Sequence, residues 1–187
     1  MNLNVGILSF IFCISFIFGT GCITHGVDDN AGYEKWNLTL EWDEKKNHLT
    51  LSDLKNMYSY TGYGYLVSTT GIKYGPFVGK GVPLYELNHM IGVTDEFSSL
   101  YLYGSDEYLW VLDHDQIFGE NFITFNENLS EIKDQNITPV LMYEQDGKPL
   151  SYEDGGPVRL ALLTDREGVI TEGSGWVKWI SRIELHK

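Results

Sequence analysis

Two basic residues near the C-terminal end carry the clearest chemical signal in the sequence. Arg159 lies in Gly155-Gly156-Pro157-Val158-Arg159-Leu160, and Lys178 lies in Gly175-Trp176-Val177-Lys178. Each follows a glycine-containing stretch and falls in a short apolar segment that we expect to be a strand. Arginine offers a planar fork and lysine a point charge, so together they suit an anion such as a phosphate or carboxylate.

The alternative for Arg159 and Lys178 is structural. The chain has 26 aspartate and glutamate residues, and this abundance favours pairing each basic residue with a carboxylate of its own. The motifs would then be explained by sheet packing alone. If the two strands run side by side, however, their basic side chains can converge on one anion, so both interpretations stay open.

Other reactive side chains form weaker patterns. Asp113-His114-Asp115 could present ligands to a hard cation, but we favour a solvated turn after a strand. Ser174, between two glycines, lacks the strand–elbow–helix setting of an activated serine. Clustered tyrosines could form either a binding surface or half-buried strand packing. We therefore assign no catalytic residue and no metal ligand; the clustered tyrosines are Tyr58, Tyr60, Tyr63, Tyr65 and Tyr74.

The N-terminus has the features of an export signal. The apolar run from Val5 to Phe18 is short for a membrane span and fits a signal-peptide core. Gly19-Thr20-Gly21 and Cys22 follow it and resemble the lipobox of secreted lipoproteins. We expect a signal peptide at 1–21, lipidation at Cys22, a tether at 22–33 and one domain at 34–187. The protein would then be exported and anchored to the outer face of the cytoplasmic membrane.

Charge and cysteine content limit the partners. The net charge of −13 repels nucleic acid, which we exclude as a partner, and also anionic membrane surfaces. The membrane contact that we expect is therefore the lipid anchor, and the other partner is a small anionic ligand or a protein. Cys13 falls inside the expected signal, so the mature domain has no disulfide. Sequons at Asn37, Asn128 and Asn136 leave glycosylation undecided.

Hydrophobic patterning predicts an α+β domain that is mainly β. Large apolar residues alternate with polar ones from Trp36 to Trp42, as expected for a strand with one buried face. Ser52 is the expected N-cap of a short helix over 53–57, and apolar spacing predicts a second helix over 84–91. The segment 69–79 is rich in turn residues. Further strands are expected at 47–51, 58–67, 99–103, 108–112, 138–144, 158–163 and 177–185.

Six motifs, in this order, resemble those of the oxidoreductase molybdopterin-binding (sulfite-oxidase-type) superfamily. The resemblance covers about residues 36–185 and implies the fold of that domain. The motifs are Leu49-Thr50-Leu51-Ser52-Asp53-Leu54, Gly81-Val82-Pro83-Leu84, Ser105-Asp106-Glu107-Tyr108, Asp146-Gly147-Lys148-Pro149-Leu150, Gly155-Gly156-Pro157-Val158-Arg159-Leu160 and Trp176-Val177-Lys178-Trp179-Ile180-Ser181-Arg182-Ile183.

The resemblance also bears on function. It implies that Arg159 and Lys178 lie near the phosphate of a pterin. In catalytic members a cysteine before the Gly-Val-Pro-Leu motif binds molybdenum, but residues 58–80 contain no cysteine. We therefore expect no cofactor and a non-catalytic binding or accessory protein. The alternative is a molybdopterin-dependent oxidoreductase, or a subunit of one, with unusual ligation.

Overall fold

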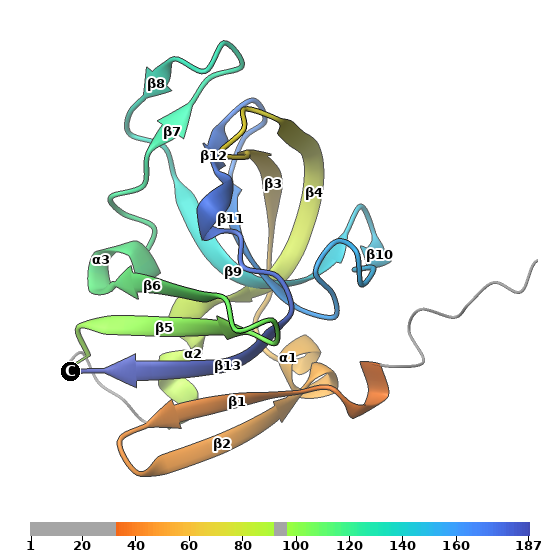
Figure 1. The fold of residues 1–187 in the computed structure, drawn as a ribbon, viewed down its shortest axis with the longest axis vertical. Helices are drawn as coiled ribbons and strands as arrows, with labels where there is room; N and C mark the ends of the chain where they lie inside the picture. Colours follow the sequence, from red (N-terminus) through yellow and green to blue (C-terminus); the bar gives the residue numbers. More distant parts are fainter. Residues whose placement is uncertain (1–32, 92–96) are drawn as a thin grey trace, which may run out of the picture.

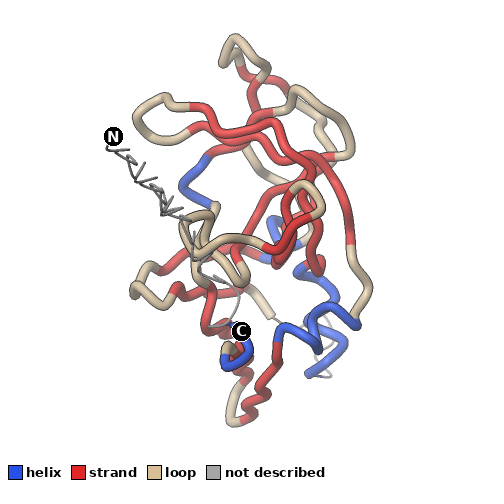
Figure 2. Tube along the Cα trace, turned by 90° about the vertical axis from the view of Figure 1, so that its right-hand side faces the viewer, coloured by secondary structure: helices blue, strands red, loops and turns tan. Residues whose placement is uncertain are grey.

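Strands dominate the fold, and its helices are short. The structure is a computed structural model that describes residues 33–91 and 97–187. Figure 2 shows the preponderance of strands. The helices are η1 (Tyr33–Lys35), α1 (Leu51–Asn56), α2 (Leu84–Ile91), α3 (His114–Ile117) and η2 (Gly173–Gly175). Within the described residues, no helix is long and apolar enough to cross a membrane.

The first sheet joins the two ends of the described chain. Its strand order is β2-β1-β13-β5-β6, and β1 runs parallel to β13 while the other neighbours are antiparallel. Figure 1 shows this sheet below the second one. Its strands are β1 (Asn37–Trp42), β2 (Lys45–Thr50), β5 (Ser99–Gly104), β6 (Leu109–Asp113) and β13 (Ile180–His186).

The second sheet closes on itself. β3 pairs with β4, β4 with β9, β9 with β11, and β11 with β3 again, while the remaining strands extend from this ring. The strands are β3 (Tyr60–Val67), β4 (Lys73–Pro83), β7 (Thr124–Phe125), β8 (Glu131–Ile132), β9 (Ile137–Gln145), β10 (Lys148–Pro149), β11 (Arg159–Thr164) and β12 (Ile170–Glu172).

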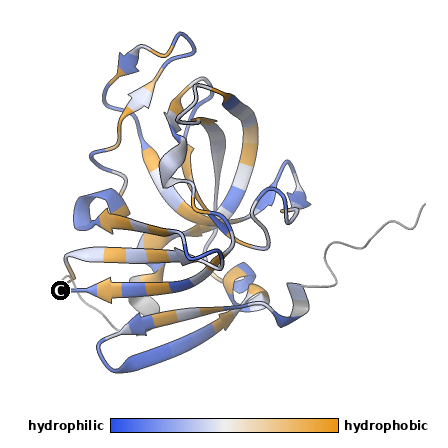
Figure 3. Ribbon diagram, viewed as in Figure 1, coloured by the Kyte–Doolittle hydropathy of each residue, from blue (hydrophilic) through white to orange (hydrophobic). Residues whose placement is uncertain are grey.

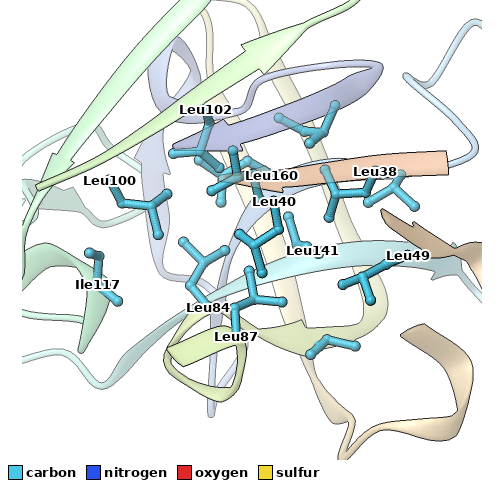
Figure 4. Packing of buried hydrophobic residues seen from close by; sticks show 14 of the residues in the cluster. Leu38, Leu40, Leu49, Leu84, Leu87, Leu100, Leu102, Ile117, Leu141 and Leu160 are labelled. Carbon is cyan, nitrogen blue, oxygen red and sulfur yellow. The ribbon is translucent and has the colours of Figure 1, made fainter. Parts of the chain in front are cut away.

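A leucine-rich core fills the space between the first sheet and the elements behind it. Apolar and polar residues alternate along β5 and β13 (Figure 3), and the buried residues of β5 follow the same alternation. In Figure 4, side chains from α2 and β9 meet those of β1 and β5. The residues in contact there include Leu38, Leu40, Leu84, Leu87, Leu100, Leu102, Leu141 and Leu160.

A second core lies inside the closed ring, and β9 contributes to both cores. Leu141 and Tyr143 belong to the first core, whereas Val140 and Met142 belong to the second. Successive side chains of a strand point to opposite faces, so β9 is buried on both sides. Every residue of β11 is also buried. These two strands therefore join the halves of the domain.

Several sequence-based expectations need correction at element ends. Thr50, not Ser52, is the N-cap of α1: its side chain accepts the N–H of Asp53, and the Asp53 carboxylate accepts the N–H of Thr50. This reciprocal pair is a capping box. Residues 73–83 form the long strand β4 despite their glycines and Pro76, because β3 supplies pairing partners for residues 73–81 and β9 for residues 79–83. The last strand begins at Ile180, three residues later than expected.

The other expected elements are present, some with shifted ends. α2 spans Leu84–Ile91, and the strands near residues 36, 47, 99, 108, 138 and 158 are present with small shifts. The domain is α+β and mainly β, as the patterning predicted. The expected signal peptide, Cys22 and nearly all of the tether lie outside the described residues.

Candidate functional site

Arg159 and Lys178 line one pocket, which we call the Arg159 pocket. It lies where the β3–β4 hairpin, the β5–β6 turn, the segment at 153–159 and the segment at 173–179 meet. Its volume is about 660 Å³. Cavities that hold small molecules typically measure about 300–1,000 Å³, so the space suits a small ligand.

Backbone hydrogen bonds bring the two basic segments side by side. Leu160 donates its N–H to the Val177 carbonyl at 2.8 Å, and Ile180 donates to the Val158 carbonyl at 3.0 Å. Lys178 falls between these contacts, in the loop before β13 and not within the strand. The side-by-side arrangement anticipated from the sequence is therefore present, although only Arg159 lies in a strand.

Arg159 is a buried cation that has no carboxylate partner within 4.0 Å in the described part of the chain. Its side chain is 8% exposed, Nη1 donates to the Asp154 carbonyl at 2.8 Å, and Nη2 donates to the Trp176 carbonyl at 3.1 Å. The guanidinium carbon lies 5.2 Å from the centre of the Trp176 ring. Among the described residues, Nε has no hydrogen-bond partner, and no carboxylate lies within 4.0 Å of the guanidinium nitrogens.

Burial dominates the electrostatics of both basic residues. It lowers the pKa of Arg159 to about 10, while the charge of Asp154 acts in the opposite direction. Burial also lowers the pKa of Lys178, and the nearby charge of Arg159 lowers it further. The Lys178 ammonium donates to the Glu153 carbonyl at 2.5 Å. The two cations thus act on each other, and both donate to backbone carbonyls.

Aromatic side chains form the walls of the pocket. Trp176 is buried, donates its indole N–H to Thr171 Oγ1 at 2.9 Å and packs edge-to-face against Phe77. Trp179 donates its indole N–H to the Tyr152 carbonyl at 2.8 Å, and its φ of +51° is rare for a bulky residue. Several backbone and side-chain contacts therefore hold the Trp179 ring in place.

Sequence reasoning did not assign these aromatic residues, nor Asp106 and Tyr108, to the site. Trp176 and Trp179 flank Lys178, and this proximity was the available signal. Asp106 and Tyr108 come from the β5–β6 turn, about fifty residues before the basic segments. Their place depends on a long-range contact in which Ser105 donates its N–H to the Trp179 carbonyl at 2.9 Å.

The other candidate residues have structural roles. Asp113 is the N-cap of α3, and the His114 ring packs against Phe97 and Phe118, in agreement with the favoured turn. Ser174 lies in η2, and its carbonyl accepts the hydroxyl of Tyr108. In the part of the chain that is described, no group of three or more His, Cys, Asp or Glu residues could hold a metal ion.

The tyrosines and the sequons remain consistent with more than one role. Tyr60 packs against the second core, whereas Tyr58 is 59% exposed and Tyr74 is 52% exposed and lines the Arg159 pocket. The clustered tyrosines therefore divide between packing and surface. All three sequon asparagines are exposed, namely Asn37, Asn128 and Asn136.

Comparison with known proteins defines the family. Residues 25–187 match the model of the oxidoreductase molybdopterin binding domain, so the chain belongs to that family. Among solved structures it is similar to the sulfane dehydrogenase SoxCD from Paracoccus pantotrophus, with a TM-score of 0.61 and 18% identity. The similarity covers 82% of this chain and 39% of that one, so the chain spans about two fifths of the length of its structural relative. The comparison with curated proteins finds no match.

The site residues fit the phosphate of the family's molybdopterin cofactor but not its molybdenum. Arg159 and Lys178 have the charge and donors that a pterin phosphate requires. The segment at 58–80, where catalytic members carry the molybdenum-binding cysteine, forms the β3–β4 hairpin and contains no cysteine. A hydroxyl is a poor substitute for a soft thiolate, so this hairpin lacks the expected metal donor.

Gly155 controls the position of Lys178, which leads to a first prediction. Gly155 has a φ of +96°, and a β-carbon there would lie 2.6 Å from Cγ of Lys178. Gly155→Ala therefore combines backbone strain of about 1–2 kcal/mol with displacement of the lysine. We expect urea denaturation to show a loss of stability clearly larger than that of the matched variant Gly147→Ala.

Gly147 is a suitable control because its φ is +73° but nothing lies within 4 Å of a β-carbon there. It carries the backbone strain without the crowding. Equal losses of stability in the two variants would show that Lys178 does not pack against Gly155 in solution.

Proposed function

We propose that this protein is a non-catalytic member of its family that binds a small anionic ligand in the Arg159 pocket. The burial of the Arg159 guanidinium, with no carboxylate of residues 33–91 or 97–187 within 4.0 Å, is the observation that supports this proposal most directly. Removing a charge from water is costly unless an opposite charge and hydrogen bonds compensate it. The two carbonyls that Arg159 contacts supply hydrogen bonds but no full negative charge.

The donors of Arg159 also favour a ligand over a purely structural role. A guanidinium has five N–H donors, and the two carbonyls use two of them. The Nε donor is buried and without a partner in the described residues. A bound anion beside Arg159 and Lys178 would accept from the remaining Nη donors and would add its negative charge to that of Asp154. A purely structural role, in which Arg159 links the carbonyls of residues 154 and 176, explains the two bonds but leaves the burial of the charge offset only by the more distant Asp154 carboxylate.

The absence of a soft donor supports a non-catalytic role. If a molybdopterin enters the pocket, Arg159 and Lys178 would hold its phosphate, and the cofactor would supply any redox chemistry. The β3–β4 hairpin offers no thiolate to fix the metal. The alternative function is a molybdopterin-dependent oxidoreductase or a subunit of one. Family membership favours it.

The N-terminal sequence supports the proposed location. An apolar run ends in Gly19-Thr20-Gly21 and Cys22, the order found before a lipidated cysteine. We propose that the protein is exported and that Cys22 tethers it to the outer face of the cytoplasmic membrane. The domain would then encounter ligands outside the cell.

Phosphate binding provides the direct test of the pocket. Inorganic phosphate should bind the wild-type protein, because Arg159 and Lys178 offer it charged hydrogen-bond donors in one pocket. Charge-assisted hydrogen bonds contribute about 1.5–3 kcal/mol, so Lys178→Gln should weaken binding by roughly ten-fold or more. Isothermal titration calorimetry measures this change, and Lys45→Gln on the exposed edge strand β2 is the control.

Lys178 is the better first substitution because Arg159→Ala removes two buried hydrogen bonds and could destabilise the fold. No detectable phosphate binding by the wild-type protein, or equal binding by Lys178→Gln and Lys45→Gln, would refute the anion site.

Metal content separates the two candidate functions. Mature protein produced together with the molybdenum-cofactor machinery should contain far less than one molybdenum per chain, because it has no thiolate ligand in residues 58–80. Elemental analysis of the purified protein gives the ratio. About one molybdenum per chain would establish the oxidoreductase alternative and unusual ligation.

Fractionation tests the proposed anchor. Cys22→Ser should remove the lipidation site, so the protein should move from the membrane fraction to the soluble fraction. Immunoblotting of the two fractions measures this change, and Cys13→Ser is the matched control because it lies within the expected signal. A Cys22→Ser protein that stays in the membrane with its N-terminus intact would identify the apolar run as an uncleaved anchor.

A further inference from the structure

The Arg159 pocket contains charges of both signs, and among the described residues these side chains form no ion pair within 4.0 Å with one another. Its lining includes two basic and three acidic side chains: Arg159, Lys178, Asp106, Glu153 and Asp154. Among the described residues, the ion pairs within 4.0 Å all involve other side chains. The positive and negative side chains of the pocket are therefore available to a ligand that carries both a negative and a positive group.

The acidic residues occupy two different places. Glu153 and Asp154 immediately precede the Gly155 turn, and both raise the pKa of Lys178, so they lie on the basic side of the pocket. The Asp154 carboxylate is already occupied, because it accepts the Ser151 hydroxyl at 2.6 Å. Asp106 belongs to the β5–β6 turn, which Figure 1 shows beside the segment that leads into β13.

Asp106 and Tyr108 form an acidic and aromatic corner. Tyr108 donates its backbone N–H to Asp106 Oδ1 at 3.2 Å, and its hydroxyl donates to the Ser174 carbonyl at 3.1 Å. These contacts fix the ring, which is 43% exposed, on the pocket wall. A carboxylate beside an aromatic ring attracts ammonium groups through charge and through the ring quadrupole.

We propose that the Arg159 pocket binds a zwitterion whose anionic group contacts Arg159 and Lys178 and whose ammonium group contacts Asp106 and Tyr108. The net charge of −13 favours this class, because a strongly acidic protein repels free anions more than ligands of low net charge. The proposal rests on the proposed function, since it uses the same anion site. The zwitterion proposal adds an ammonium group to the expected ligand, and it names Asp106 and Tyr108 as the residues that recognise this group.

The test compares soluble phosphocholine, glycerol 3-phosphate, inorganic phosphate and choline as probes in isothermal titration calorimetry. Phosphocholine should bind at least roughly ten-fold more tightly than inorganic phosphate or glycerol 3-phosphate, because it also gains the ammonium contact. Choline alone should bind more weakly than phosphocholine. Equal affinities for phosphocholine and glycerol 3-phosphate would overturn the zwitterion proposal while leaving the anion site intact.

A substitution at Asp106 assigns the ammonium contact. Asp106→Asn keeps an oxygen that can accept the Tyr108 N–H, so the turn should persist. It should abolish the preference for phosphocholine without weakening phosphate binding, because it removes a carboxylate that repels the anion. Asp43→Asn, the same change in the β1–β2 turn outside the pocket, should keep the preference. If Asp106→Asn still prefers phosphocholine as strongly as the wild-type protein does, the proposed ammonium site is wrong.

The anion site and the ammonium site fail in different ways. If the wild-type protein does not bind phosphate, the proposed function itself is refuted. If it binds phosphate but does not prefer phosphocholine, only the proposal of a zwitterionic ligand is refuted. Co-sedimentation with phosphatidylcholine vesicles would identify a lipid headgroup as the source of the zwitterion. Binding of soluble phosphocholine without co-sedimentation would identify a free ligand, and both results uphold the proposal.

Discussion

The burial of β9 and β11 on both faces is the constraint on which the rest of the structure depends. β9 supplies Leu141 to the core beneath the first sheet and Met142 to the core inside the closed ring. A strand that serves two cores can neither slide nor twist freely, because a shift of one residue exchanges its two faces. The pairing of Arg159 with Met142 is part of this register. The first residue of β11 is therefore held inside the protein although it carries a charge.

The surroundings of Arg159 reduce the cost of this burial in several ways. Two backbone carbonyls accept its donors, and the Trp176 ring lies against the guanidinium. These contacts depend on the turn at Gly155, whose carbonyl accepts the N–H of Trp179 at 3.0 Å. The same turn leaves room for the Lys178 side chain. The strained backbone at Trp179 and the glycine at 155 are thus consequences of bringing two basic segments together around one space.

The sequence predicts the elements whose patterns are local and misses those defined by distant partners. Alternation from residue 36 to 42 and apolar spacing from residue 84 to 91 identify a strand and a helix correctly. In contrast, Gly75 and Pro76 suggest turns, yet β4 passes through them because β3 pairs with the residues on both sides of them, across a shift in register. The residue types within a segment do not show which distant strand will pair with it.

In the candidate site, too, the sequence identifies residues with a local pattern and misses those placed by distant contacts. The basic residues could be identified because each stands alone in an apolar, glycine-containing segment. Asp106 and Tyr108 could not, because a polar turn between two strands has no local signal that places it beside a segment seventy residues away. The bond from Ser105 to the Trp179 carbonyl makes that connection. The proposed anion site and the segment where catalytic members carry the metal ligand lie on different parts of the chain. The former depends on backbone pairing between residues 155–160 and 176–180, and the latter on the hairpin at 58–80. A thiolate can therefore be absent from the hairpin without disturbing the basic residues, because nothing in the pairing that holds Arg159 requires a metal.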